Sequence, residues 1–121
     1  MVKEAVMRDS IVKRIPMENG KNLDIVKSTH FGERDAERNI NGLMVAVEKV
    51  TKVYIKILDR WAKTNQPKLE GVIKSSSGLN IVYSVYANRF DPNCIDFVMQ
   101  TIINKQNFTA KKHGDFIIIA D

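Results

Sequence analysis

Residues 40–61 read INGLMVAVEKVTKVYIKILDRW, and this stretch decides the fold of the 121-residue chain. Its apolar side chains recur at alternating spacings of three and four residues, which is the a/d pattern of a heptad repeat. The heptad seam consists of Ile40, Leu43, Val47, Val50, Tyr54, Ile57 and Trp61. The pattern predicts one long helix from about Asp35 to Lys63, which at a rise of about 1.5 Å per residue is about 40 Å long.

The predicted helix is longer than the rest of the domain is wide. A globular domain of this size has a diameter of roughly 26 Å, so one small sheet cannot cover the whole seam. We therefore expect part of the seam to pack on a second copy of the chain, as the interface of a homodimer or a higher oligomer. The alternative is that the seam packs entirely on the chain's own sheet.

Short β-rich segments lie on both sides of this helix. The predicted strands are residues 10–15, 23–28, 69–74, 79–86 and 116–120. Asn19–Gly20 supplies a hairpin turn between the first two strands, and a Ser-Ser-Ser-Gly run at residues 75–78 supplies the turn between the next two.

A shorter second helix is predicted to begin at Asp91–Pro92, because aspartate caps helices and proline fits the first helical position. Its buried face would consist of Ile95, Val98, Met99, Ile102 and Ile103. Together these elements predict a single α+β domain over residues 1–121. Its small sheet of about five strands would carry one long and one shorter helix, in the order β-β-α-β-β-α-β.

The formal net charge of +5 arises mainly in the second half of the chain. Five basic residues at helical spacing form a basic stripe along the predicted long helix, away from the seam: Lys49, Lys52, Lys56, Arg60 and Lys63. Such a stripe is typical of a solvated helix face. It can also face an anion or the phosphates of a nucleic acid.

Two other segments are better shaped to hold a small anionic ligand. Arginine offers a planar fork to phosphate, and a phenylalanine ring offers a surface on which a base can stack. The predicted ligand-binding residues are Asn88, Arg89, Phe90, Lys111, Lys112 and His113. The first three follow a strand that is predicted to be central, and the last three lie at the final turn.

The sequence holds no motif for catalysis or for a cofactor. It has no glycine-rich phosphate loop and no G-x-S-x-G elbow. Its two histidines, His30 and His113, have no metal-ligand spacing. Its single cysteine, Cys94, offers neither an intrachain disulfide nor a cysteine-based metal site. We therefore expect a protein that is not an enzyme and that uses no metal or cofactor.

The N-terminal residues 1–15 mix charged and apolar side chains at short intervals. No apolar run in the sequence is long enough for the core of a signal peptide or for a membrane span. The expectation is a cytoplasmic protein with no membrane partner.

Two resemblances add to these expectations. The opening strands, the Gly-Glu-Arg-Asp helix start at Gly32–Asp35, the long helix, the paired strands and the closing helix-strand unit resemble the phage Thoeris anti-defence nucleotide sponges. That resemblance implies a small, non-enzymatic, oligomeric protein that sequesters cyclic ADP-ribose-type signals in pockets at subunit interfaces. Residues 68–108 are also similar to TonB C-terminal-like domains, which are usually periplasmic and follow an export or membrane signal.

The sequence thus predicts a cytoplasmic, non-catalytic, homo-oligomeric binding protein that sequesters a small anionic nucleotide-type signal. One alternative is a nucleic-acid-binding module that uses the basic stripe. Another is a protein-interaction or inhibitor module anchored by exposed aromatic side chains, chosen from Tyr54, Trp61, Tyr83 and Tyr86.

Overall fold

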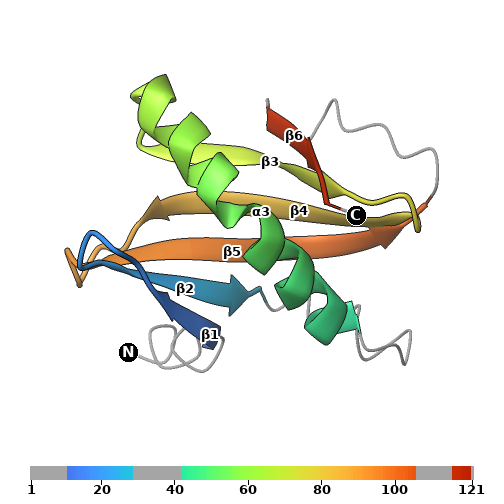
Figure 1. Ribbon diagram of the computed structural model, residues 1–121, viewed down its shortest axis with the longest axis horizontal. Coiled ribbons are helices and arrows are strands. Elements are labelled where there is room, and N and C mark those ends of the chain that lie inside the picture. The colour runs from blue at the N-terminus through green and yellow to red at the C-terminus, as the bar shows by residue number, and fades with distance from the viewer. Residues whose placement is uncertain (1–10, 29–41, 106–115, 121) are drawn as a thin grey trace.

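A mixed six-stranded sheet with one helix across it makes up the described part of the chain, residues 11–28, 42–105 and 116–120 of the computed structural model (Figure 1). The elements are β1 (Ile11–Pro16), β2 (Asn22–Lys27), α3 (Gly42–Thr64), β3 (Lys68–Lys74), β4 (Leu79–Ala87), β5 (Cys94–Asn104) and β6 (Phe116–Ile119). The predicted α+β class is confirmed.

The strands lie in the order β1-β2-β5-β4-β3-β6. β3, β4 and β5 form an antiparallel meander at the centre. The β1–β2 hairpin joins this meander through a parallel pairing of β2 with β5, and β6 joins it through a parallel pairing with β3. The hairpin and the last strand thus extend the meander on its two opposite sides.

The core lies between α3 and one face of the sheet, which the helix crosses diagonally (Figure 1). Ala46, Val50, Val53 and Ile57 face the sheet from the helix and are buried. Alternate residues of the strands meet them, so that Tyr83 and Phe97 stack in the core with their ring centroids 5.1 Å apart. The remaining residues of each strand point to the opposite face of the sheet.

The predicted second helix is wrong, because residues 94–104 form β5. In this strand Ile95, Phe97 and Met99 face the core, and so does Ile102, which is three residues further along. The reason is a β-bulge at Gln100: Tyr83 pairs with Met99, but Val82 pairs with Thr101. The extra residue shifts the inward alternation from odd to even positions, and the resulting spacing imitates the period of a helix.

The Asp91–Pro92 pair belongs to a turn and does not begin a helix. The Asp91 carboxylate accepts a hydrogen bond from the backbone N–H of Asn93 at 2.9 Å, and the Asp91 carbonyl accepts one from the N–H of Cys94 at 3.1 Å. Aspartate favours such local hydrogen bonds in turns as strongly as it favours helix caps, so the residue pair alone does not distinguish the two.

The C-terminal end of α3 lies where the sequence predicts it. Asn65 adopts a left-handed backbone conformation with φ of 55°, which ends the helix. The Trp61 indole N–H then donates to the carbonyl of Gln66 at 3.0 Å and holds the turn into β3. The predicted start near Asp35 and the seam residue Ile40 lie outside the described residues.

Gly71 in β3 allows two neighbours to approach its backbone closely. A Cβ atom there would collide with the carbonyl oxygen of Phe116 and would lie 2.6 Å from the hydroxyl oxygen of Tyr83. That hydroxyl donates to the same Phe116 carbonyl at 3.3 Å, which ties β6 to the core. The pairing of β6 therefore depends on the missing side chain at Gly71.

We expect Gly71→Ala to lower the free energy of unfolding by about 1–3 kcal/mol, because the added methyl group overpacks the contact between β3 and β6. Urea denaturation followed by tryptophan fluorescence measures this loss. Glu70→Ala, at the exposed neighbouring position, is the control and should change the stability little. A Gly71→Ala protein as stable as the wild type would contradict the close approach.

Candidate functional site

Asn88 organises the turn between β4 and β5, residues 88–93, which we call the 88–93 loop. Its side-chain Oδ1 accepts hydrogen bonds from the backbone N–H groups of Phe90 at 2.8 Å and Asp91 at 2.9 Å. Its Nδ2 donates to both carboxylate oxygens of Asp96, at 3.1 and 3.3 Å. Its backbone N–H donates to the carbonyl of Cys94 at 3.0 Å. Both ends of the Asn88 amide, a predicted ligand group, therefore already have hydrogen-bond partners within the chain.

Arg89 and Phe90 form the exposed tip of this loop. The Phe90 side chain is 74% exposed, and the guanidinium carbon of Arg89 lies 6.0 Å from the centroid of its ring. A planar cation beside an exposed ring can pair with a phosphate and stack with a base. These two of the six predicted ligand residues are thus presented to solvent together.

The other half of the predicted site, Lys111, Lys112 and His113, lies outside the described residues. The nearest described residue before it, Lys105, donates its backbone N–H to the carbonyl of Gly78 at 2.8 Å, next to the first residue of β4. Asn88 follows the last residue of β4, at the other end of the strand. The structure therefore places only the first of the two predicted groups, and a site that combines both stays a prediction.

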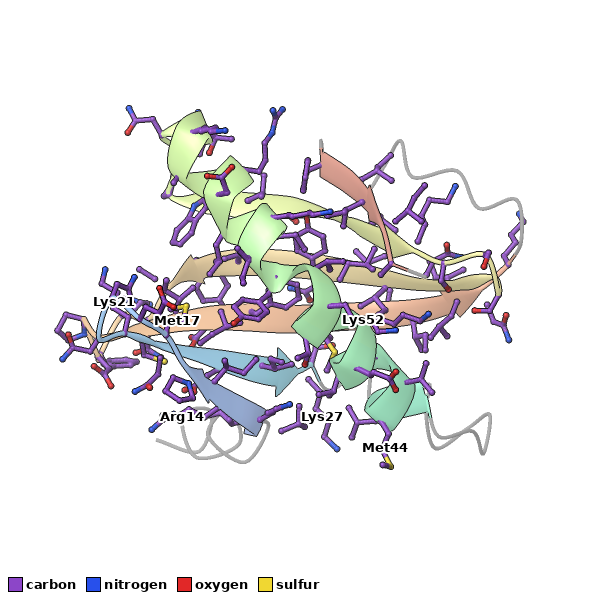
Figure 2. The ribbon with its side chains drawn as sticks, viewed as in Figure 1. Arg14, Met17, Lys21, Lys27, Met44 and Lys52 are labelled. Atoms are coloured by element: carbon purple, nitrogen blue, oxygen red, sulfur yellow. The ribbon has the colours of Figure 1, made fainter. Side chains whose placement is uncertain are left out.

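A polar row crosses the face of the sheet opposite α3 and meets the 88–93 loop at Asp96, which Asn88 contacts. Successive cross-strand partners in five strands make up the row: Arg14, Asp24, Asp96, Tyr86 and Lys68. It begins with Arg14 on β1 (Figure 2), next to the strand that carries Asp24. The row places two carboxylates side by side on β2 and β5.

Asp24 is the better neutralised of the two carboxylates. Arg14 forms a bidentate pair with it, Nε to Oδ1 at 2.7 Å and Nη2 to Oδ2 at 2.9 Å. The Asp24 side chain is only 2% exposed, whereas that of Arg14 is 54% exposed. The hydrogen bond from Arg14 lowers the pKa of Asp24 below its usual value, in spite of burial. Asp24 is therefore ionised at neutral pH.

Among the described residues, no cation forms an ion pair with Asp96. Burial raises the pKa of Asp96, the neighbouring charge of Asp24 raises it further, and the hydrogen bond from Asn88 acts in the opposite direction. The two adjacent carboxylates therefore differ in how readily they take up a proton, and Asp96 takes it up first as the pH falls.

The Cys94 thiol lies between these carboxylates. Its Sγ donates to Asp24 Oδ2 at 3.0 Å and lies 3.8 Å from Asp96 Oδ1. Burial, followed by the hydrogen bond to Asp24, raises the pKa of Cys94 to about 12. Because the thiolate is the nucleophilic form, this cysteine is poorly suited to nucleophilic catalysis.

Asp24, Cys94 and Asp96 could together offer ligands to a metal ion, since one ligand atom from each lies within 4.8 Å of the others. In the structure these atoms are satisfied by protein groups. Both oxygens of Asp24 accept from Arg14, and the thiol keeps its proton. A metal would have to displace Arg14 and deprotonate Cys94.

Sequence reasoning missed this cluster because it assigned residues 94–104 to a helix. In a strand, residues two apart share a face, so Cys94 and Asp96 point the same way. Their approach to Asp24 also needs the parallel register of β2 with β5. Strand alternation in the sequence could have revealed the first relation but not the second.

Most of the described residues of the heptad seam pack against the chain's own core. Val50 and Ile57 are fully buried in the chain's own core. Leu43, Val47, Tyr54 and Trp61 are partly buried against the same core. The central seam residues therefore pack on the sheet of the same chain, which was the alternative to an oligomer interface. An oligomer interface through the partly buried seam residues stays a prediction.

Met44 and Ile55 are the most exposed of the large apolar side chains of α3. Met44, at the N-terminal end of the helix (Figure 2), is 73% exposed, and Ile55 is 68% exposed. Residues eleven apart lie about three turns apart on one line of a helix. This line adds apolar surface beside the half-buried part of the seam.

Three residues of the basic stripe have partners within the chain. Lys52 pairs with Glu48 at 3.7 Å and Lys63 with Asp59 at 3.1 Å, both four residues apart on the helix. Arg60 lies over the ring of Phe116, 5.5 Å from its centroid. Lys49 and Lys56 have no ion-pair partner among the residues that the structure describes. The stripe is therefore partly neutralised.

The aromatic residues considered as protein-interaction anchors are mostly covered. Tyr83 is fully buried, and Tyr54, Trp61 and Tyr86 are partly buried. Phe90 is the large aromatic side chain exposed in the described residues. Within those residues, no helix has the length and apolarity required to cross a membrane.

The chain was compared with family models, curated proteins and solved structures. No protein-family model, no curated protein and no solved structure matches the chain.

We expect Cys94 to resist alkylation by iodoacetamide at neutral pH, because the thiol is buried and protonated. As the chain holds a single cysteine, intact-mass spectrometry reads the modification directly. The same protein in urea should be alkylated within minutes. Rapid labelling of the folded protein would contradict the environment described for the thiol.

We expect Ile57→Ala to lower the free energy of unfolding by about 2–5 kcal/mol, independently of protein concentration, because Ile57 packs in the chain's own core. Ile55→Ala removes the same groups from a position that is exposed in the single chain, so in the dilute, monomeric protein it should cost less than about 0.5 kcal/mol. Denaturation at two protein concentrations tests both variants. A loss that depends on concentration would place Ile57 against a partner chain.

Proposed function

We propose that the chain is a non-catalytic binding protein that holds a small anionic nucleotide-type ligand at the tip of the 88–93 loop. The observation that carries the proposal is the exposed pair of Arg89 and Phe90 on a turn tied internally by Asn88. A loop that is already ordered loses little conformational entropy on binding, so its exposed groups are effective contacts.

The roles of the two side chains follow from their chemistry. The guanidinium of Arg89 would pair with a phosphate through its planar fork. The ring of Phe90 would stack on a base, which requires only a planar face and tolerates different bases. The loop thus suits a ligand that has both groups, as nucleotides do.

Binding without turnover is supported by the chemistry next to the loop. The Cys94 thiol is protonated and buried, and the Asp24 carboxylate is paired with Arg14. A nucleophile would require a thiolate, and a general base would require an ionised group with free access to substrate. We therefore propose that the protein sequesters its ligand, as the resemblance to the nucleotide sponges implies.

Self-association is part of this proposal. The half-buried seam and the exposed Met44 and Ile55 provide apolar surface on α3 for a second copy. In the proposed oligomer, each subunit would contribute its own 88–93 loop.

Native mass spectrometry with ATP, ADP, cyclic AMP and cyclic ADP-ribose tests the proposal. We expect an oligomer that carries intact ligand masses, released unchanged on denaturation. Arg89→Ala should weaken binding by about tenfold or more, the usual loss for a hydrogen bond to a charged group. The Phe90→Ala variant should weaken it as well.

Lys56→Ala is the matched control, because it removes one exposed positive charge on α3 far from the loop in sequence. This variant should bind as the wild type does. Equal losses in Arg89→Ala and Lys56→Ala would show attraction by net charge alone. Loss in Lys56→Ala only, with a steep dependence on salt, would favour nucleic-acid binding by the basic stripe. Either result would overturn the proposed site.

A further inference from the structure

The hydrogen bonds of Asn88 connect the 88–93 loop to the buried carboxylate of Asp96. One end of its amide, Nδ2, faces the two oxygens of Asp96, and the other end, Oδ1, faces the N–H groups of Phe90 and Asp91. An amide has donors at one end and an acceptor at the other, so each end fits one kind of partner. Here the donor end meets Asp96 and the acceptor end holds the loop.

The charge of Asp96 selects this orientation. An ionised carboxylate only accepts hydrogen bonds, so the Nδ2 end of Asn88 must face it. A protonated carboxyl group keeps one acceptor oxygen, but its other oxygen becomes an O–H donor and its charge is lost. Nδ2 of Asn88 then keeps only one, weaker, of its two contacts with Asp96. The amide is held less firmly, and so are the two loop N–H groups that donate to its Oδ1.

We propose that Asp96 is a positioning residue for ligand capture: in its ionised form it orients the Asn88 amide and thereby orders the Arg89–Phe90 tip, and on acidification it releases the tip. This proposal rests on the proposed function for the role of the tip in binding. The orientation of Asn88 and its dependence on Asp96 stand on the hydrogen bonds alone.

The surroundings of Asp96 raise its pKa above the usual aspartate value. The titratable and charged groups around it are Asp24 on β2, Cys94 on β5 and Tyr86 on β4, with Arg14 on β1 paired to Asp24. Burial and the charge of Asp24 both raise the pKa of Asp96 above the usual aspartate value. Tyr86, whose own pKa burial raises, stays neutral in this range.

The sign of the pH dependence follows from the contact with Asn88. This hydrogen bond lowers the pKa of Asp96, so the ionised form and the ordered loop favour each other. Loop order is therefore present above the pKa of Asp96 and is lost as the pH falls through it. Asp24, whose pKa is lowered, stays ionised over the same range.

Amide hydrogen exchange without ligand tests the proposal directly. In the wild type, the protection factors of the Phe90 and Asp91 amides should fall by about tenfold between neutral pH and a pH below the pKa of Asp96, as expected for loss of hydrogen bonds. In Asp96→Asn, which cannot titrate, the protection factors should be independent of pH in this range. Flat protection in the wild type would overturn the proposal.

Variants that swap the amide of Asn88 and the carboxylate of Asp96 give a second test. Asn88→Asp places a second carboxylate beside Asp96, so its loop should be least ordered at neutral pH and should gain order on acidification, opposite to the wild type. The double variant Asn88→Asp/Asp96→Asn restores one acceptor-only group and one amide. Its loop should be ordered at neutral pH and should lose order only at lower pH, because position 88 is less buried than position 96.

Glu70→Gln is the matched control, since Glu70 is an exposed carboxylate on the same sheet that pairs with Lys68 at 3.3 Å. It should keep the wild-type pH profile. A profile shared by the wild type and Asp96→Asn would assign the pH response to another group and overturn the proposal.

Ligand binding then separates this inference from the proposed function. A loop that responds to acid in a protein that binds no nucleotide would support the positioning role and overturn the ligand. Nucleotide binding of equal strength at both pH values, in the wild type and in Asp96→Asn, would support the ligand and overturn the positioning role.

Discussion

The parallel pairing of β2 with β5 is the constraint on which the rest of the structure depends. It attaches the N-terminal hairpin to the central meander, and its register places Asp24 directly beside Asp96. Two carboxylates at neighbouring positions on one face repel each other, and both are removed from water here. The fold therefore has to supply partners for both, and the two partners are different in kind.

Arg14 satisfies Asp24 with charge, and Asn88 satisfies Asp96 with a neutral amide. The first solution ties β1 to β2, because the guanidinium spans the two strands. The second ties the sheet to the 88–93 loop. One buried carboxylate thus holds β1 and β2 together. The other holds the 88–93 loop to the sheet.

The features that could be predicted from the sequence are those set by neighbouring residues. The heptad spacing predicted α3 and its end, and the Asn19–Gly20 pair predicted the first hairpin. β5 was mistaken for a helix because the bulge at Gln100 breaks its alternation. The register that brings Asp24 to Cys94 and Asp96 joins residues about seventy positions apart, and no local pattern encodes it. The exposed Arg89–Phe90 tip was predicted correctly as part of the loop, but the structural role of Asn88 was not.

The division between the two carboxylates also explains where the molecule responds to its surroundings. Asp24 is stabilised as an anion by a bidentate cation, so its charge persists and β1 stays tied to β2. Within the residues that the structure describes, Asp96 is held by dipoles and not by a cation, in a buried position next to that permanent charge, so it is the weaker anion of the pair. A change in proton concentration therefore acts on the group that contacts the loop before it acts on the group that secures the fold. The arrangement separates a responsive contact from a structural one although both lie in the same row of the sheet.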